Sequence, residues 1–209
     1  MIYDISPLVD SDIAVWPGDT PYSAEDMLRI EDGESVHLST IKLSCHTGAH
    51  ADAPCHYAAG APGIDAANLE QYLGPCVLLD VRPEIHAIGV ADLGDLDLSG
   101  APRVLFRTRE NADRTVFPAP LTHLTVELID WLAERECVLI GLDSPSVDAF
   151  DSKDLPCHKA LLRHQIVNLE CLALGGVAPG RYELIALPLR LAGRDASPVR
   201  AILRDLPAG

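Results

Sequence analysis

A short segment rich in histidine and aspartate carries the strongest chemical signal in this chain of 209 residues. It reads Cys45-His-Thr-Gly-Ala-His-Ala-Asp-Ala-Pro-Cys-His56 and holds three of the eight histidines. Four of its ligand-type residues occupy even positions, which share one face of an extended chain: His46, His50, Asp52 and His56. Imidazole and carboxylate groups together suit zinc, and also manganese or iron. The spacing therefore predicts a metal site, and such metals activate water for hydrolysis.

These side chains can converge only if the segment bends. A straight strand would separate His46 from His56 by roughly 33 Å, at about 3.3 Å per residue. Gly48 can adopt backbone angles that other residues avoid, and Pro54 fixes a turn. We therefore expect a folded-back loop. Asp52 could bridge two metals through its two oxygens, while His56 is either a ligand or a nearby acid–base group.

Glu170 is a second candidate ligand, far from the first segment in the chain. It lies in the run Val167-Asn-Leu-Glu-Cys-Leu172, which is otherwise mostly apolar. A carboxylate in such a run is costly to bury unless it is paired or bound to a metal. Ser144 lacks the Gly-x-Ser-x-Gly surroundings of a serine hydrolase, so we expect a structural turn there.

Branched apolar runs and helical spacing predict the elements that must position these residues. We expect strands over 39–44, 76–81, 104–108, 137–142, 182–191 and 199–205. Helices are expected over 122–136, 159–164 and 65–72. The runs within 76–81 and 137–142 are almost uniformly apolar, which is typical of strands buried on both faces. The mixture indicates an α/β fold with a substantial sheet, in one domain over residues 1–209.

Charge and composition limit the partners. A formal net charge of −15 repels phosphate backbones, so we expect no nucleic-acid partner. The N-terminus lacks the features of a secretory signal and the apolar runs are too short to span a membrane, so we expect a cytoplasmic protein. The six cysteines form no Cys-x-x-Cys pair. Most are expected to be buried, and roles for Cys45, Cys55 and Cys157 beside the candidate ligands stay open.

The segment at 46–56 resembles the signature of the cyclase-like metal-dependent hydrolases, H-x-G-[TA]-H-x-D-x-P-x-H. Further stretches resemble one branch of that family, the bacterial kynurenine formamidases (arylformamidases), and extend the resemblance over nearly the whole chain. They are residues 4–7, 15–19, 141–148, 151–153, 182–189 and 195–203. The resemblance implies a swivelling β/β/α domain with a mixed sheet core and flanking helices, assembled as a homodimer.

The resemblance also implies roles for individual residues. The last histidine of the signature, His56, would donate and accept protons, and Trp16 would line the substrate site. Trp16 could equally be a core anchor near the N-terminus. A histidine and a glutamate twelve positions apart complete the implied ligand set, and His164 does not fit that spacing. The implied ligands are His46, His50, Asp52, His158 and Glu170.

The activity implied by the resemblance is hydrolysis of a small molecule, N-formyl-L-kynurenine, to L-kynurenine and formate in tryptophan degradation. The implied cofactor is zinc, two ions per subunit, with manganese as the alternative. Three other readings stay open: a related amidohydrolase that acts on a substrate such as isatin, a catalytically silent metal-binding dimer, and a thiol redox sensor built on Cys45 and Cys55.

Overall fold

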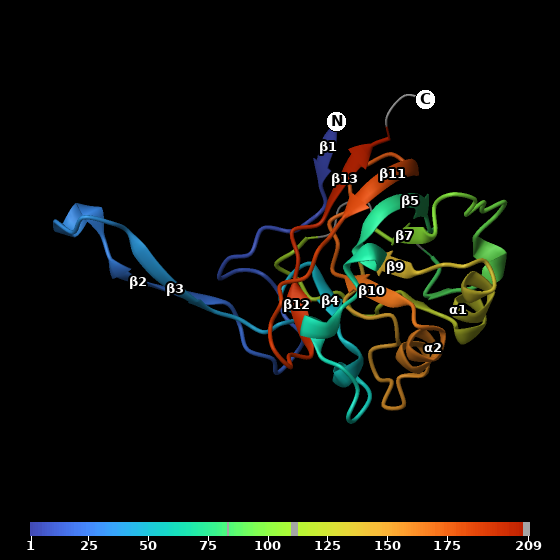
Figure 1. The fold of residues 1–209 in the computed structure, drawn as a ribbon, viewed down its shortest axis with the longest axis horizontal. Coiled ribbons are helices and arrows are strands. Elements are labelled where there is room, and N and C mark those ends of the chain that lie inside the picture. The colour runs from blue at the N-terminus through green and yellow to red at the C-terminus, as the bar shows by residue number, and fades with distance from the viewer. Residues whose placement is uncertain (83, 110–112, 207–209) are drawn as a thin grey trace.

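The computed structural model describes residues 1–82, 84–109 and 113–206. Within this part of the chain, nine strands form one mixed sheet in the order β1-β13-β11-β5-β7-β9-β10-β4-β12 (Figure 1). Four neighbouring strands at its centre are parallel. They are β5 (Leu73–Asp80), β7 (Arg103–Arg107), β9 (Leu139–Leu142) and β10 (Val167–Glu170).

Antiparallel strands extend the sheet on both sides of this centre. On one side β11 pairs with β5, β13 with β11, and β1 with β13. The first and last strands of the chain, β1 and β13, therefore lie side by side at the top of Figure 1. On the other side β4 pairs with β10, and β12 with β4. These flanking strands are β1 (Ile2–Asp4), β4 (His50–Asp52), β11 (Gly180–Ile185), β12 (Ala196–Pro198) and β13 (Ile202–Asp205).

Alternate residues of the central strands enter two different cores, because successive side chains of a strand point to opposite faces. In β7, Leu105 joins one cluster of buried residues, while Val104 and Phe106 join the other. Both faces of the central sheet are therefore covered, which explains why consecutive residues in the middle of β5, β7 and β9 are apolar.

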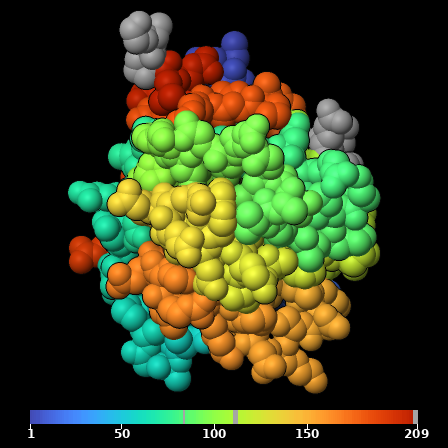
Figure 2. All heavy atoms as spheres, turned by 90° about the vertical axis from the view of Figure 1, so that its right-hand side faces the viewer, coloured from blue at the N-terminus to red at the C-terminus, as the bar shows by residue number. Residues whose placement is uncertain are grey.

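Two α-helices, α1 (Val126–Ala133) and α2 (Pro156–His164), cover one of these faces. Their buried leucines pack with the cluster that contains Phe106, and the helices contact each other. Figure 2 shows this side of the molecule, with the yellow and orange atoms of the helical segments beside the green atoms of residues around 100. The Thr125 hydroxyl accepts a hydrogen bond from the Leu128 N–H and so caps the start of α1.

A hairpin arm projects away from the rest of the molecule (Figure 1). It consists of β2 (Ser23–Leu28), a 3₁₀ turn η1 (Ile30–Asp32) and β3 (Leu38–Lys42), and the two strands pair with each other in antiparallel register. Nearly every residue of the two strands is exposed.

The predicted α/β fold with a mixed sheet is confirmed, and six predicted strands and two helices correspond to real elements. The helix predicted over 65–72 is wrong: two short 3₁₀ segments, η3 (Ile64–Ala66) and η4 (Leu69–Tyr72), occupy it. The helix predicted over 122–136 is shorter, because 123–124 form β8 (His123–Leu124), which pairs with β6 (Ala87–Ile88). The strand predicted over 182–191 ends at Ile185. No helix in the described part of the chain is long and apolar enough to cross a bilayer.

Candidate metal centre

Strand β4 places two ligand-type side chains on one face of the sheet. His50 and Asp52 are alternate residues of this strand, so they point to the same side. The antiparallel register sets Glu170 of β10 directly opposite His50, and Ala196 of β12 directly opposite Asp52. The pairing of β4 with β10 therefore brings the two sequence segments of the predicted site together.

The chain turns on both sides of β4, as the sequence predicts. Gly48 has φ of +67°, in the left-handed region where a side chain is strained. Pro54 begins a 3₁₀ segment, η2 (Pro54–His56), immediately after the strand. These two turns carry His46 and His56 back toward the strand, and their ring centroids lie 4.3 Å apart. The predicted bend is confirmed.

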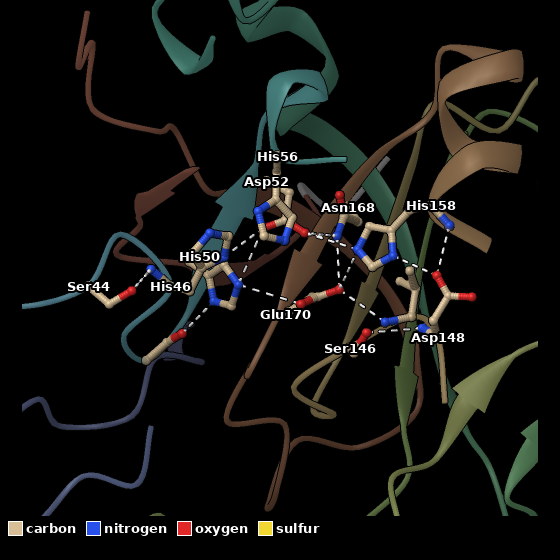
Figure 3. A network of polar contacts seen from close by, with 12 residues as sticks. Ser44, His46, His50, Asp52, His56, Ser146, Asp148, His158, Asn168 and Glu170 are labelled. Carbon is tan, nitrogen blue, oxygen red and sulfur yellow. Dashed lines mark hydrogen bonds and ion pairs between the residues drawn. The ribbon is translucent and has the colours of Figure 1, made fainter. Parts of the chain in front are cut away.

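Asp52 lies at the centre of the cluster, with its side chain 1% exposed. One carboxylate oxygen, Oδ1, is 3.0 Å from His46 Nδ1 and 3.4 Å from His50 Nε2. The other, Oδ2, is 3.4 Å from His158 Nε2. Because its two oxygens face different imidazoles, Asp52 links the two sides of the cluster (Figure 3).

Glu170 closes the opposite side of the cluster. Its oxygens lie 3.5 Å from His50 Nε2 and 3.7 Å from His158 Nε2. Ligand-type atoms of two overlapping groups lie within 4.8 Å of one another, and Asp52 belongs to both: His46, Asp52 and His56, and His50, Asp52 and Glu170. The structure thus gathers every residue of the ligand set implied by the resemblance, with His56 beside it.

His158 is held in place by Asp148, which the sequence did not identify as a site residue. The Asp148 carboxylate accepts a hydrogen bond from His158 Nδ1 at 2.6 Å. It also accepts from the backbone N–H groups of Cys157 at 2.8 Å and His158 at 3.1 Å, in the first turn of α2. One buried carboxylate therefore caps the helix and fixes the ring that the helix presents, which leaves His158 Nε2 free to face the cluster.

Asn168 links the two central carboxylates. Its Nδ2 donates to Asp52 Oδ2 at 2.8 Å and to Glu170 Oε1 at 3.0 Å, and Glu170 Oε1 also accepts from the Val147 N–H at 3.0 Å. Asn168 is fully buried and lies two positions before Glu170 in β10. Alternate residues of a strand share a face, so this parity is the signal that could have identified Asn168.

Buried atoms of the cluster lack hydrogen-bond partners among the described residues. These atoms include His50 Nε2, His158 Nε2 and Asp52 Oδ1. The other ring nitrogen of His50 donates to the Gly48 carbonyl at 2.9 Å, so Nε2 is the nitrogen left to bind. Unpartnered polar atoms cost free energy when buried, and a cation among them would remove that cost. The donor set of imidazoles and carboxylates fits a divalent metal.

The electrostatics of the cluster agree with that fit. Burial disfavours the charged form of His158, but the hydrogen bond to Asp148 and the nearby Asp52 carboxylate raise its pKa to about 10. Burial likewise opposes ionisation of Asp52, and the close imidazoles of His158, His46 and His50 hold its pKa well below the ordinary value. The carboxylates therefore attract positive charge to this position, and a divalent cation supplies such charge.

His56 differs from His50 and His158, which are buried. Its side chain is 35% exposed, and burial lowers its pKa from the ordinary value. Its ring centroid lies 6.1 Å from that of His158. Asp195, in the loop before β12, faces both outer histidines, with Oδ2 at 3.2 Å from His46 Nε2 and 3.8 Å from His56 Nδ1. His56 thus stands between the buried cluster and the solvent.

A cavity of about 650 Å³ opens onto the cluster. Trp16 lines it and is 37% exposed, so it is not a buried core anchor. The Trp16 ring packs against Phe117 and Phe150, at centroid distances of 5.4 and 5.2 Å. These contacts form one apolar aromatic wall, suited to an aryl group. His164 lies outside the cluster, on α2, where Nε2 is 2.7 Å from Asp130 Oδ1.

The cysteines beside the site are free thiols. Burial raises the pKa of the Cys45 thiol, which disfavours the reactive thiolate. Cys157 is buried and donates to the Leu124 carbonyl at 3.2 Å, so it is part of the core. The Cys55 thiol donates to the Arg194 carbonyl.

The cyclase family model matches residues 3–149, and this chain belongs to the cyclase family. The chain is 48% identical to the kynurenine formamidase of Bordetella petrii, over 98% of each protein. It is equally similar to the kynurenine formamidase of Polaromonas naphthalenivorans, 48% identical over 98% of this chain and 91% of that protein. A solved structure described as a potential metal-dependent hydrolase with cyclase activity is similar in fold, with a TM-score of 0.83, 27% identity, and coverage of 97% of this chain and 96% of that one.

Proposed function

We propose that this chain hydrolyses the formyl amide of N-formyl-L-kynurenine to L-kynurenine and formate, a step of tryptophan degradation. The observation that carries the proposal is the convergence of three imidazoles and the Glu170 carboxylate on Asp52, at the base of a cavity with an aromatic wall. The 48% identity to proteins named kynurenine formamidase supports the choice of substrate.

The residues that would hold the cofactor are His46, His50, Asp52, His158 and Glu170. We propose two zinc ions per chain, with manganese as the alternative. When bound, such ions would polarise a carbonyl and lower the pKa of water toward 7. Elemental analysis of the purified protein should give two metal equivalents per chain, and one equivalent would contradict the proposed stoichiometry.

His56 is the residue we assign to proton transfer. Water adds to the formyl carbon, His56 accepts the proton that the water loses, and the bond between the formyl carbon and the aniline nitrogen breaks. His56 returns that proton to the nitrogen, which leaves poorly unless it is protonated. Its position supports the role, because it lies beside the buried histidines but is open to the cavity. Trp16 would pack on the aryl ring of the substrate.

The test of this assignment separates proton transfer from metal binding. His56→Gln should lower kcat by about 100-fold or more, the usual scale of general acid–base catalysis, while the metal content stays at the wild-type value. His164→Gln is the matched control, because that imidazole is paired with Asp130 on the helix surface. If His56→Gln loses metal, His56 is a ligand, as its place near His46 and Asp52 also allows.

The rival substrate is a cyclic amide such as isatin. The arrangement of the ligand-type residues is compatible with hydrolysis of either a linear or a cyclic amide. Parallel measurement of kcat/KM for N-formyl-L-kynurenine and isatin decides between them. A clear preference for isatin would refute the formamidase assignment and retain the metal site.

We also propose that the chain forms a homodimer through the hairpin arm. The arm carries five large apolar side chains that are about half exposed: Met27, Ile30, Val36, Leu38 and Ile41. Such a set on a projecting hairpin is typical of a contact surface, and the proposed occupant is a second copy of this chain. Light scattering should give about 45 kDa, twice the 22.5 kDa of one chain. Replacing residues 24–41 by a short turn should give a monomer, and an unchanged mass would refute the role of the arm.

A further inference from the structure

Two arginines line the cavity, and they differ in their partners. Arg114 is neutralised by Asp10, whose two oxygens accept from Nη1 at 2.6 Å and Nη2 at 2.7 Å. Arg109 lies two positions after the end of β7 and has no such partner. Within the described ranges 1–82, 84–109 and 113–206, its guanidinium forms no ion pair with an aspartate or glutamate. Arg109 is therefore the arginine of this wall that keeps its charge available to a ligand.

Asp143 holds Arg109 in place without forming an ion pair with its guanidinium. Burial raises the pKa of Asp143, although the positive charge of Arg109 is close enough to favour the ionised form. The Asp143 carboxylate accepts from the backbone N–H groups of Thr108 and Arg109, both at 2.9 Å, and from the Thr108 hydroxyl at 2.6 Å. The guanidinium Nη2 donates at 2.7 Å to the backbone carbonyl of Asp143. The backbone and the side chain of Arg109 are thus both fixed by one neighbour, which preorganises the remaining guanidinium N–H groups.

An anion is the ligand chemistry that this arrangement favours. A partly buried cation whose guanidinium forms no ion pair costs free energy, and the surplus of acidic residues in this chain, net charge −15, makes such an arginine at a cavity wall unusual. The planar guanidinium presents N–H groups in the geometry of a carboxylate. The aromatic wall formed by Trp16 and Phe117 lies in the same cavity. A ligand with an aryl ring and a carboxylate would match both features.

We propose that Arg109 is a specificity-determining residue that binds the α-carboxylate of the substrate, and that Asp143 is its positioning residue. This inference rests on the proposed function, in which the substrate is an aryl formamide that carries an amino-acid group. Arg109 then selects substrates with that group, while the histidine–carboxylate cluster acts on the formamide.

The experiment compares N-formyl-L-kynurenine with 2-formamidoacetophenone, which has the same aryl formamide but no amino-acid group. For wild type, the ratio of kcat/KM for the two substrates should favour formylkynurenine. In Arg109→Gln this ratio should fall by roughly 10- to 100-fold, mainly through KM, as expected for the loss of a charge-assisted pair. Arg109→Lys should recover part of the ratio, because it keeps the charge and loses the planar geometry.

Arg114→Gln is the matched control, since it removes an equal charge from the same cavity wall at a position already paired with Asp10. The ratio should be unchanged in this variant. An unchanged ratio in Arg109→Gln, whether or not both activities fall together, would overturn the proposal. If the ratio instead falls in Arg114→Gln, the substrate carboxylate binds at Arg114, and the proposal for Arg109 is also overturned.

A binding measurement separates this proposal from the proposed function. Calorimetry should show that wild type binds L-kynurenine more tightly than 2-aminoacetophenone, and that Arg109→Gln loses this difference. If wild type hydrolyses neither formamide, the proposed function fails, and an Arg109-dependent preference for L-kynurenine would still support the carboxylate site. If wild type is active but L-kynurenine binding does not depend on Arg109, only the inference about Arg109 fails.

Discussion

Asp148→Asn is the substitution that tests the organisation of the site most directly. The carboxylate is 2% exposed and accepts three hydrogen bonds, from the His158 ring and from two N–H groups of the first turn of α2. Asparagine keeps the shape but turns one acceptor into a donor, so at least one of these three donors must lose its partner. Both the orientation of His158 and the cap of the helix are weakened.

The magnitudes follow from these two roles. Loss of the partner that orients a metal-binding histidine typically lowers metal affinity by about 10- to 100-fold, or roughly 1.4–2.7 kcal/mol. Loss of a helix cap costs about 1 kcal/mol, and for a protein of this length 1 kcal/mol lowers Tm by about 2–4 °C. Asp148→Asn should therefore bind metal at least tenfold more weakly and should also melt a few degrees lower after chelation.

Two assays read these effects separately. Competition with a chromophoric chelator gives the metal affinity, and thermal unfolding in EDTA gives the stability of the protein without its metal. The matched control is Asp154→Asn, which removes the same charge from an exposed residue just before α2. An affinity within twofold of wild type in Asp148→Asn would refute the view that Asp148 orients His158, and an unchanged Tm in EDTA would refute its role as a cap.

Three further predictions concern the core and the cluster. Gly141→Ala should lower the free energy of unfolding by about 1–3 kcal/mol in a denaturant titration, because a Cβ there would overlap the Leu105 side chain; an unchanged midpoint would show that this side chain can move away. Removal of metal with EDTA should lower Tm by about 8–16 °C, given roughly 4 kcal/mol for a metal at 1,000 times its Kd and the scaling above; equal Tm values with and without EDTA would mean that these residues bind no metal. Asn168→Asp should destabilise the chelated protein by about 3 kcal/mol, since it places a third buried carboxylate beside Asp52 and Glu170. The loss should be smaller with metal bound, and a loss of equal size in the two states would refute the electrostatic explanation.

The strands of the central sheet were predictable because each is a local run of branched apolar residues. β5, β7 and β9 are buried on both faces, and a strand of this kind is recognisable in the sequence as a continuous apolar run. Over residues 65–72 the sequence predicts a helix, although the chain forms only separate 3₁₀ turns there. The strand at 39–44 was found, but nothing local showed that it belongs to an arm outside the main sheet.

The short strands that build the site were not predictable in the same way. β4 is the tripeptide His50-Ala-Asp52, and it is a strand because β10 and β12 pair with it on its two sides. Those partners lie far away in the sequence, so no local pattern reveals them. The parity of His50 and Asp52 and the turn at Gly48 were readable, whereas Asp148 and Asn168 became visible only when α2 and β10 were placed. That residues 1–209 form one domain stays a prediction.

The register between β4 and β10 also has a consequence for folding. His50 and Glu170 face each other across that pair, although 120 positions separate residues 50 and 170. A metal held between them would act as a non-covalent cross-link that closes a loop of this length, and closing a long loop restricts the unfolded chain as a disulfide does. A slip of the register by one residue would turn Glu170 to the opposite face and leave the cross-link without one of its ends. Metal binding can therefore serve as a check on correct strand pairing, since the ion would be retained only by chains in which the two strands are aligned.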